Sequence, residues 1–124
     1  MKPLMLVVAC AALGTLAMAC GGGTRPFEQP PAHVDRALGR AAIEGYGCAG
    51  CHNIPGVTPK GNVGPPLEGF ARHAYVAGVL PNTVDNVARW VADPRGVAPS
   101  TAMPNLGVTP EHAQAIAAYL ATLK

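Results

Sequence analysis

Cys48-Ala49-Gly50-Cys51-His52 is the stretch that decides the fold of this chain. Residues three positions apart share one face of a helix, so the thiols of Cys48 and Cys51 can hold one edge of a flat ring system. His52 follows directly and can turn a ring nitrogen towards the centre of that ring. The C-x-x-C-H spacing is the attachment signature of c-type haem, in which both thiols form thioethers to the vinyl groups and the histidine binds the iron. The stretch therefore predicts one covalently attached haem c.

Two other uses of a C-x-x-C pair compete with haem attachment. A zinc site needs a second pair of ligands, and the sequence has no further cysteine pair and no H-x-x-x-H. A thioredoxin-like site needs alternating strands and helices, and few segments of this sequence resemble strands. A periplasmic thiol oxidoreductase that uses Cys48 and Cys51 stays open as an alternative hypothesis.

The first nineteen residues resemble an export signal, with Lys2 before an uncharged apolar run over 4–16 and small residues before Cys20. This run is too short to span a bilayer. The stretch Leu16-Ala17-Met18-Ala19-Cys20 resembles a bacterial lipobox, which predicts that Cys20 is lipidated; the alternative is ordinary cleavage before a free cysteine. We expect a signal peptide over 1–19, a flexible tether over 20–32 and a folded domain over 33–124. The protein would be exported and anchored in the periplasm or on the outer face of the cytoplasmic membrane.

Composition limits the class of protein. The 124-residue chain carries a net charge of only +2, which argues against binding to nucleic acid or to a membrane surface by charge. About 105 residues beyond the signal suffice for one domain, and we expect a monomer. The 15 glycines and 13 prolines, dense over 53–66, predict long loops and leave little apolar surface to bury. A buried cofactor would complete the core.

Helical periodicity predicts an all-α fold of three to five helices joined by long Gly/Pro-rich loops. One stripe of Val34, Leu38, Ala41, Ala42 and Tyr46 predicts a helix that ends at Gly45 and Gly47. A short helix is expected over 71–79. Thr83 is a good N-cap for a helix that ends at Asp93-Pro94, and Thr109-Pro110-Glu111 begins a last helix that reaches Leu120. The segments 53–69 and 96–107 are expected to be loops.

Met103 is the one methionine outside the predicted signal peptide, and it stands in a loop between two predicted helices. A thioether there could take the sixth position on the iron and raise the reduction potential. His33, His73 and His112 compete for this position, although we expect His112 to be solvated. If the sixth site were open or labile, the chain would be a haem enzyme or a gas or redox sensor instead of an electron carrier.

From residue 33 to 124 the chain resembles a small bacterial class I cytochrome c. The resemblance rests on the order of five motifs, which are 48–52, Gly64-Pro65-Pro66-Leu67, Trp90-Val91-Ala92-Asp93-Pro94, Met103-Pro104 and Ile116-Ala117-Ala118-Tyr119-Leu120. It implies the cytochrome c fold wrapped around one haem, one-electron transfer and no enzymatic activity.

The resemblance also implies roles for individual residues. The Pro65 carbonyl would accept a hydrogen bond from the second ring nitrogen of His52, and Leu67 would pack on the haem. Tyr75 and Trp90 would approach the haem or its propionates, and Arg72 could pair with a propionate. The first and last helices would cross through a small residue against Tyr119, the small residue being Gly39, Ala41 or Ala42.

Residues 46–67 and 80–83 further resemble cytochrome domains that occur with terminal oxidases. This resemblance implies membrane-bound redox partners such as a terminal oxidase or a dehydrogenase of a respiratory chain. Beyond the signal the only lysines are Lys60 and Lys124, so we expect docking to be largely apolar, through loop residues such as Ile54, Val57 and Val63.

Overall fold

The computed structural model describes residues 36–124. The predicted signal peptide (1–19), the lipidation candidate Cys20, the tether (20–32) and the competing ligand His33 lie outside the described residues.

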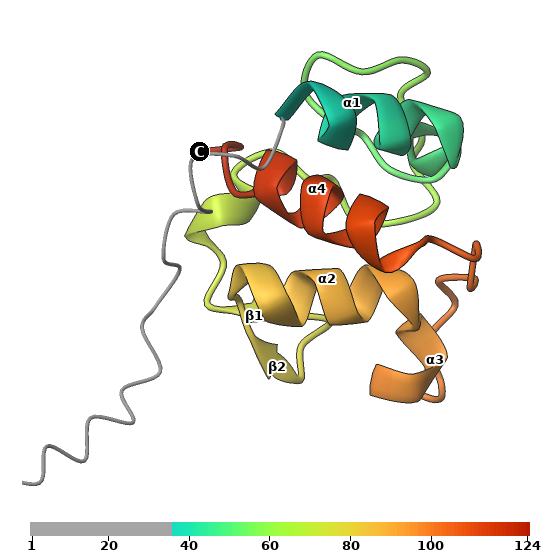
Figure 1. The fold of residues 1–124 in the computed structure, drawn as a ribbon, viewed down its shortest axis with the longest axis vertical. Coiled ribbons are helices and arrows are strands. Elements are labelled where there is room, and N and C mark those ends of the chain that lie inside the picture. Colours follow the sequence, from blue (N-terminus) through green and yellow to red (C-terminus); the bar gives the residue numbers. More distant parts are fainter. Residues whose placement is uncertain (1–35) are drawn as a thin grey trace, which may run out of the picture.

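Helices dominate the described part of the chain, which confirms the all-α fold class (Figure 1). The α-helices are α1 (Arg36–Gly45), α2 (Val84–Ala92), α3 (Pro94–Val97) and α4 (Pro110–Leu120). Two 3₁₀ turns, η1 (Cys48–Gly50) and η2 (Phe70–Arg72), and two short strands, β1 (Tyr75–Val76) and β2 (Leu80–Pro81), complete the inventory. Among the described helices, none combines the length and apolar character that crossing a membrane requires.

The predicted helix starts are confirmed at two caps. The Thr83 hydroxyl accepts a hydrogen bond from the Asn86 amide at the start of α2, and the Thr109 hydroxyl accepts one from the His112 amide at the start of α4. The expectation of a loop from residue 96 is wrong for its first two residues. Asp93 caps a further short helix, α3, by accepting from the Gly96 amide, so one Asp-Pro pair ends α2 and begins α3.

The prediction of a short helix over 71–79 is wrong. η2 ends at Arg72, and β1 then pairs antiparallel with β2, with Tyr75 opposite Pro81 and Val76 opposite Leu80. Between the strands Ala77 has φ 54° and Gly78 has φ 70°. Two consecutive residues in the left-handed region turn the chain back on itself and cannot continue a right-handed helix.

α4 lies between α1 and α2 and packs against both (Figure 1). It crosses α1 at Gly39, where a Cβ would lie 2.8 Å from the Ala115 carbonyl carbon and 2.9 Å from Tyr119 Cβ. Gly39 is therefore the small residue of the crossing, whereas Ala41, one of the two alternatives, is exposed. The aromatic partner is Tyr119, as the resemblance implied.

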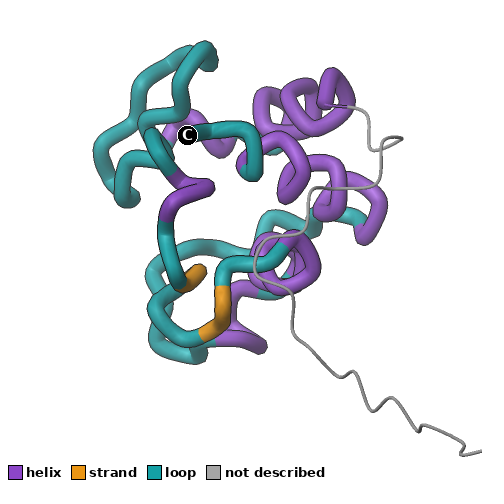
Figure 2. The backbone as a smooth tube through the Cα atoms, turned by 90° about the vertical axis from the view of Figure 1, so that its left-hand side faces the viewer, coloured by secondary structure: helices purple, strands orange, loops and turns teal. Residues whose placement is uncertain are grey.

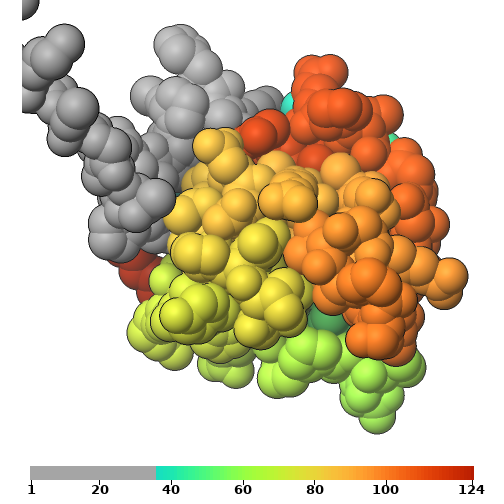
Figure 3. All heavy atoms as spheres, turned by 90° about the horizontal axis from the view of Figure 1, so that it is seen from below, coloured from blue at the N-terminus to red at the C-terminus, as the bar shows by residue number. Residues whose placement is uncertain are grey.

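The helices α1 and α4 gather on one side of the molecule, and the long loops lie on the other (Figure 2). One face is hollowed where three segments meet: the loop before η2, the β1–β2 hairpin and the segment after α2 (Figure 3). This arrangement brings residues far apart in sequence to the wall of one cavity.

Candidate cofactor site

A cavity of about 630 Å³ opens between the helices and the loops. Its volume falls in the range of small-molecule and cofactor sites, about 300–1,000 Å³. Most of the predicted cofactor-binding residues line it, from five separate segments of the chain: Cys48, Cys51, His52, Pro65, Leu67, Tyr75, Trp90 and Met103.

The two thiols are held by a tight turn at the end of α1. Gly47, with φ 72°, leads into η1, and the Cys48 carbonyl then accepts from the amides of Cys51 and His52 at 3.2 and 3.0 Å. Both cysteines are free and half-buried. Burial raises the pKa of the Cys48 thiol, and the neighbouring Cys51 raises it further. A catalytic dithiol needs a lowered pKa, so this environment argues against the thiol oxidoreductase hypothesis.

His52 is oriented by a hydrogen bond to the Pro65 carbonyl, which lies 2.7 Å from its Nδ1. Because a carbonyl oxygen only accepts, Nδ1 carries the proton and Nε2 keeps a free lone pair. This contact, implied by the resemblance, is present. A neutral imidazole held in this tautomer is the form that binds a metal.

Gly64 makes this position of the His52 ring possible. A Cβ on Gly64 would lie 2.7 Å from His52 Nδ1 and 2.9 Å from Nε2, closer than real Cβ contacts. The Gly64 amide donates to the Cys51 carbonyl at 2.8 Å and so fixes the loop against the attachment turn. Because Gly64 has no side chain, the His52 imidazole can lie close to the backbone and donate its hydrogen bond to the Pro65 carbonyl.

Met103 lines the same cavity from the loop between α3 and α4, and its side chain is half-buried. The Met103 amide donates to the Thr101 hydroxyl at 3.1 Å, which fixes the local turn. The cavity thus brings together a thioether and an imidazole that lie fifty-one positions apart in the sequence.

Some sequence predictions differ from the structure. Arg72 is exposed, packs over Gly69 and does not line the cavity. Ile54 and Val57 were expected to dock a partner, but they are 0% and 1% exposed because the loop folds them inward onto the core. Val63, in contrast, is 81% exposed at the cavity.

The two described histidines that compete with Met103 lie in different places. His73 lines the cavity. His112 was expected to be solvated, but it is half-buried and its Nδ1 lies 3.0 Å from the Tyr46 hydroxyl. No local motif marks either position, since each depends on contacts with distant segments.

The wall also contains apolar residues that sequence reasoning did not assign to the site: Ile43, Phe70, Val76, Val87, Ile116 and Leu120. Val87 is a buried residue of α2, and Ile116 and Leu120 are buried residues of α4. Among the described lining residues there is no Lys, Arg, Asp or Glu.

The donor set of the cavity suits a haem. Two thiols lie at its wall beside an imidazole with a free Nε2, and the other lining residues are mostly apolar. Among the described residues there is no group of three or more His, Cys, Asp or Glu side chains that could hold a bare metal ion. The residues present therefore fit a flat apolar macrocycle that brings its own metal.

Comparison with known proteins supports this assignment. The cytochrome c family profile matches residues 37–124. Cytochrome c oxidase subunit 2 of Alkalihalophilus pseudofirmus is 32% identical over 87 residues, which cover 69% of this chain and 25% of that protein. Cytochrome c oxidase subunit 2 of Bacillus sp. (strain PS3) is 32% identical over 88 residues, or 67% of this chain and 25% of that protein. The chain spans about a quarter of these relatives. The chain belongs to the cytochrome c family.

Proposed function

We propose that this protein is a monohaem c-type cytochrome that carries single electrons and catalyses no bond chemistry. Family membership supports electron transfer as the general function. The observation that carries the finer proposal is the 2.7 Å contact between His52 Nδ1 and the Pro65 carbonyl, because it leaves Nε2 free beside the two thiols.

In this proposal Cys48 and Cys51 would form the thioethers, and His52 Nε2 and the Met103 sulfur would bind the iron. The haem, when bound, supplies an iron that changes its oxidation state by one electron. Pro65 holds the His52 proton and so increases the basicity of the other nitrogen. The apolar wall excludes water from the site, and a thioether ligand favours the reduced state, which raises the potential.

Covalent attachment is tested by haem staining and intact mass of the denatured holoprotein. We expect the haem mass to stay with the wild-type chain after denaturation. Because the cofactor completes the core, Cys48→Ala should leave little folded protein. Release of the haem from the denatured wild-type chain would contradict the proposed thioethers, and recovery of a stable, helical apo-form of Cys48→Ala would contradict the claim that the cofactor completes the core.

We further propose a terminal oxidase as the electron acceptor and a membrane-bound dehydrogenase as the donor. The support is the similarity to two cytochrome c oxidase subunit 2 proteins, which this chain matches over a quarter of their length. The test is to identify what co-purifies with the detergent-extracted protein and to measure whether the reduced holoprotein supports oxygen uptake by that fraction. No oxygen uptake would contradict the oxidase assignment while leaving electron transfer intact.

We also propose that Cys20 carries a lipid anchor. This proposal rests on the sequence alone. The thirteen residue-to-residue steps from Cys20 to His33 give a mean reach of about 20 Å and a limit of about 43 Å. Such a tether would confine the haem domain beside the membrane and raise its effective concentration for partners in the same bilayer. Cys20→Ser should give a soluble holoprotein with an unchanged spectrum. Retention of that variant in salt-washed membranes, or a wild-type N-terminus without acyl mass, would contradict the anchor.

A further inference from the structure

Tyr46 and His112 form a side-chain pair that the proposed electron transfer does not use. The Tyr46 hydroxyl lies 3.0 Å from His112 Nδ1, and the two rings meet edge to face with centroids 5.7 Å apart. The Thr109 amide donates to the same hydroxyl oxygen at 3.4 Å. While its oxygen accepts from Thr109, the hydroxyl can donate its own proton to His112 Nδ1 in the tautomer that carries the imidazole proton on Nε2.

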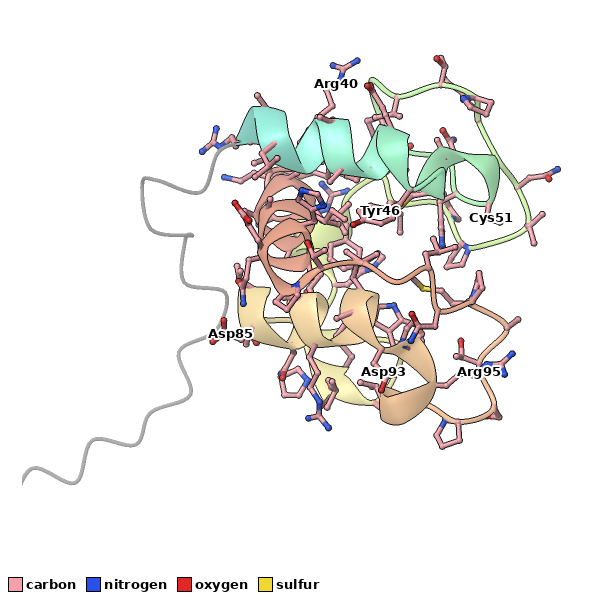
Figure 4. The ribbon with its side chains drawn as sticks, turned by 45° about the vertical axis from the view of Figure 1, so that its right-hand side comes forward. Arg40, Tyr46, Cys51, Asp85, Asp93 and Arg95 are labelled. Atoms are coloured by element: carbon pink, nitrogen blue, oxygen red, sulfur yellow. The ribbon has the colours of Figure 1, made fainter. Side chains whose placement is uncertain are left out.

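The pair joins the attachment turn to the start of α4. Tyr46 is half-buried, follows α1 directly and stands two residues before Cys48 (Figure 4). His112 lies in the first turn of α4 and is also half-buried. A phenol is therefore held in a fixed hydrogen bond to a base, partly shielded from water and close along the chain to the proposed haem thioether.

The chain contains three tyrosines, and within residues 36–124 only Tyr46 is hydrogen-bonded to a base. The Tyr119 hydroxyl donates to the Pro55 carbonyl at 3.3 Å, and a carbonyl oxygen cannot take up the proton near neutral pH. Tyr75 is 59% exposed. This difference matters because a phenol loses an electron easily only if its proton leaves at the same time. Tyr119 and Tyr75 thus serve as internal controls.

We propose that Tyr46 is a redox-active site that gives one electron to a strong one-electron oxidant while its proton moves to His112. In this step the Tyr46 O–H bond breaks and an N–H bond forms at His112 Nδ1. The products are a neutral tyrosyl radical, an imidazolium and the oxidant reduced by one electron. The imidazole is the side chain suited to receive a proton near neutral pH, and the 3.0 Å separation is within the range of direct proton transfer.

The radical would be stabilised where it forms. The Thr109 amide can go on donating to the phenoxyl oxygen, and the new N–H at His112 donates to it as well. When an electron returns to Tyr46, the proton returns from His112 and the starting state is restored. This inference goes beyond the proposed function, since it names a second redox centre that acts only when the protein is strongly oxidised.

The test uses the ferric holoprotein and photogenerated tris(bipyridine)ruthenium(III) as the oxidant. A nitroso spin trap marks the radical site, which peptide mass spectrometry then identifies. The key variant is His112→Gln, whose amide oxygen can accept the hydrogen bond but cannot take the proton. Tyr119→Phe is the matched control, because it removes a half-buried phenol that donates to a carbonyl and not to a base. The visible spectrum and helical content show that each variant is folded.

We expect the wild type and Tyr119→Phe to carry the adduct on Tyr46, and His112→Gln to lose it. Transfer into D₂O should slow the appearance of the wild-type radical, since a proton moves with the electron. An adduct on Tyr75, Tyr119 or Trp90 in place of Tyr46 would overturn the proposal. So would a wild-type yield on Tyr46 in folded His112→Gln protein. Neither result bears on haem attachment, which the spectrum reports separately.

Discussion

Replacing Gly39 by alanine should force α1 and α4 apart. The new methyl group would meet the carbonyl oxygen of Ala115, and it would lie 2.8 Å from the carbonyl carbon of the same residue. Ordinary contacts begin at 3.4 Å. The obstructing atoms belong to the backbone of α4, which cannot move as a flexible side chain would. One helix must therefore shift as a body.

The size of the effect follows from two opposing terms. Overpacking a well-packed contact costs about 1–3 kcal/mol, and occasionally more. Alanine in place of glycine within a helix favours folding by about 1 kcal/mol. Because the contact here is with backbone, we place the strain at the upper end, about 3 kcal/mol. The net expectation is a loss of about 2 kcal/mol in the free energy of unfolding.

The assay is denaturant unfolding of the holoprotein, followed by helical circular dichroism. Gly45→Ala is the matched control, since Gly45 ends the same helix and nothing lies within 4 Å of a Cβ there. The control should be as stable as the wild type or slightly more stable. A Gly39→Ala protein as stable as the control would show that α1 and α4 do not cross at this glycine.

Two further predictions concern the site. Gly64→Ala should turn the His52 ring and break its hydrogen bond to Pro65, which shifts the visible spectrum and the reduction potential. Gly50→Ala is the control and should change neither, because the space around its Cβ is open. Equal spectra in the two variants would contradict this account of Gly64. Electron transfer to the partner should depend weakly on ionic strength, because the described cavity wall carries no Lys, Arg, Asp or Glu. Val63→Lys at the cavity should introduce a stronger salt dependence than Val79→Lys, since Val79 is 55% exposed but does not line the cavity. A steep dependence in the wild type would refute apolar docking.

The sequence predicted the features that depend on local chemistry. Thr83 and Thr109 cap their helices as expected, because a cap is a contact between residues three positions apart. The spacing of Cys48, Cys51 and His52 likewise predicted one edge of the cavity. These predictions needed no knowledge of the rest of the chain.

The failures have two physical origins, a local left-handed turn in one case and contacts between distant segments in the others. The helix expected over 71–79 is replaced by a hairpin whose turn depends on the left-handed residues Ala77 and Gly78. The sequence places Ile54 and Val57 in a loop, but that loop turns both side chains into the core. His112 gains its partner from Tyr46, sixty-six positions away. No periodicity encodes such pairings, because they arise only when the helices pack.

The most direct test of the central claim is the near-infrared spectrum of the ferric holoprotein. A six-coordinate iron with His52 and Met103 as axial ligands shows a sulfur-to-iron charge-transfer band, and we expect this band in the wild type. Met103→Ala should keep the covalent haem but lose the band and the low-spin spectrum, and its potential should fall, since the thioether favours the reduced iron. A wild-type protein without the band, or a Met103→Ala protein with an unchanged spectrum, would contradict Met103 ligation and favour a haem enzyme or sensor with a labile sixth site.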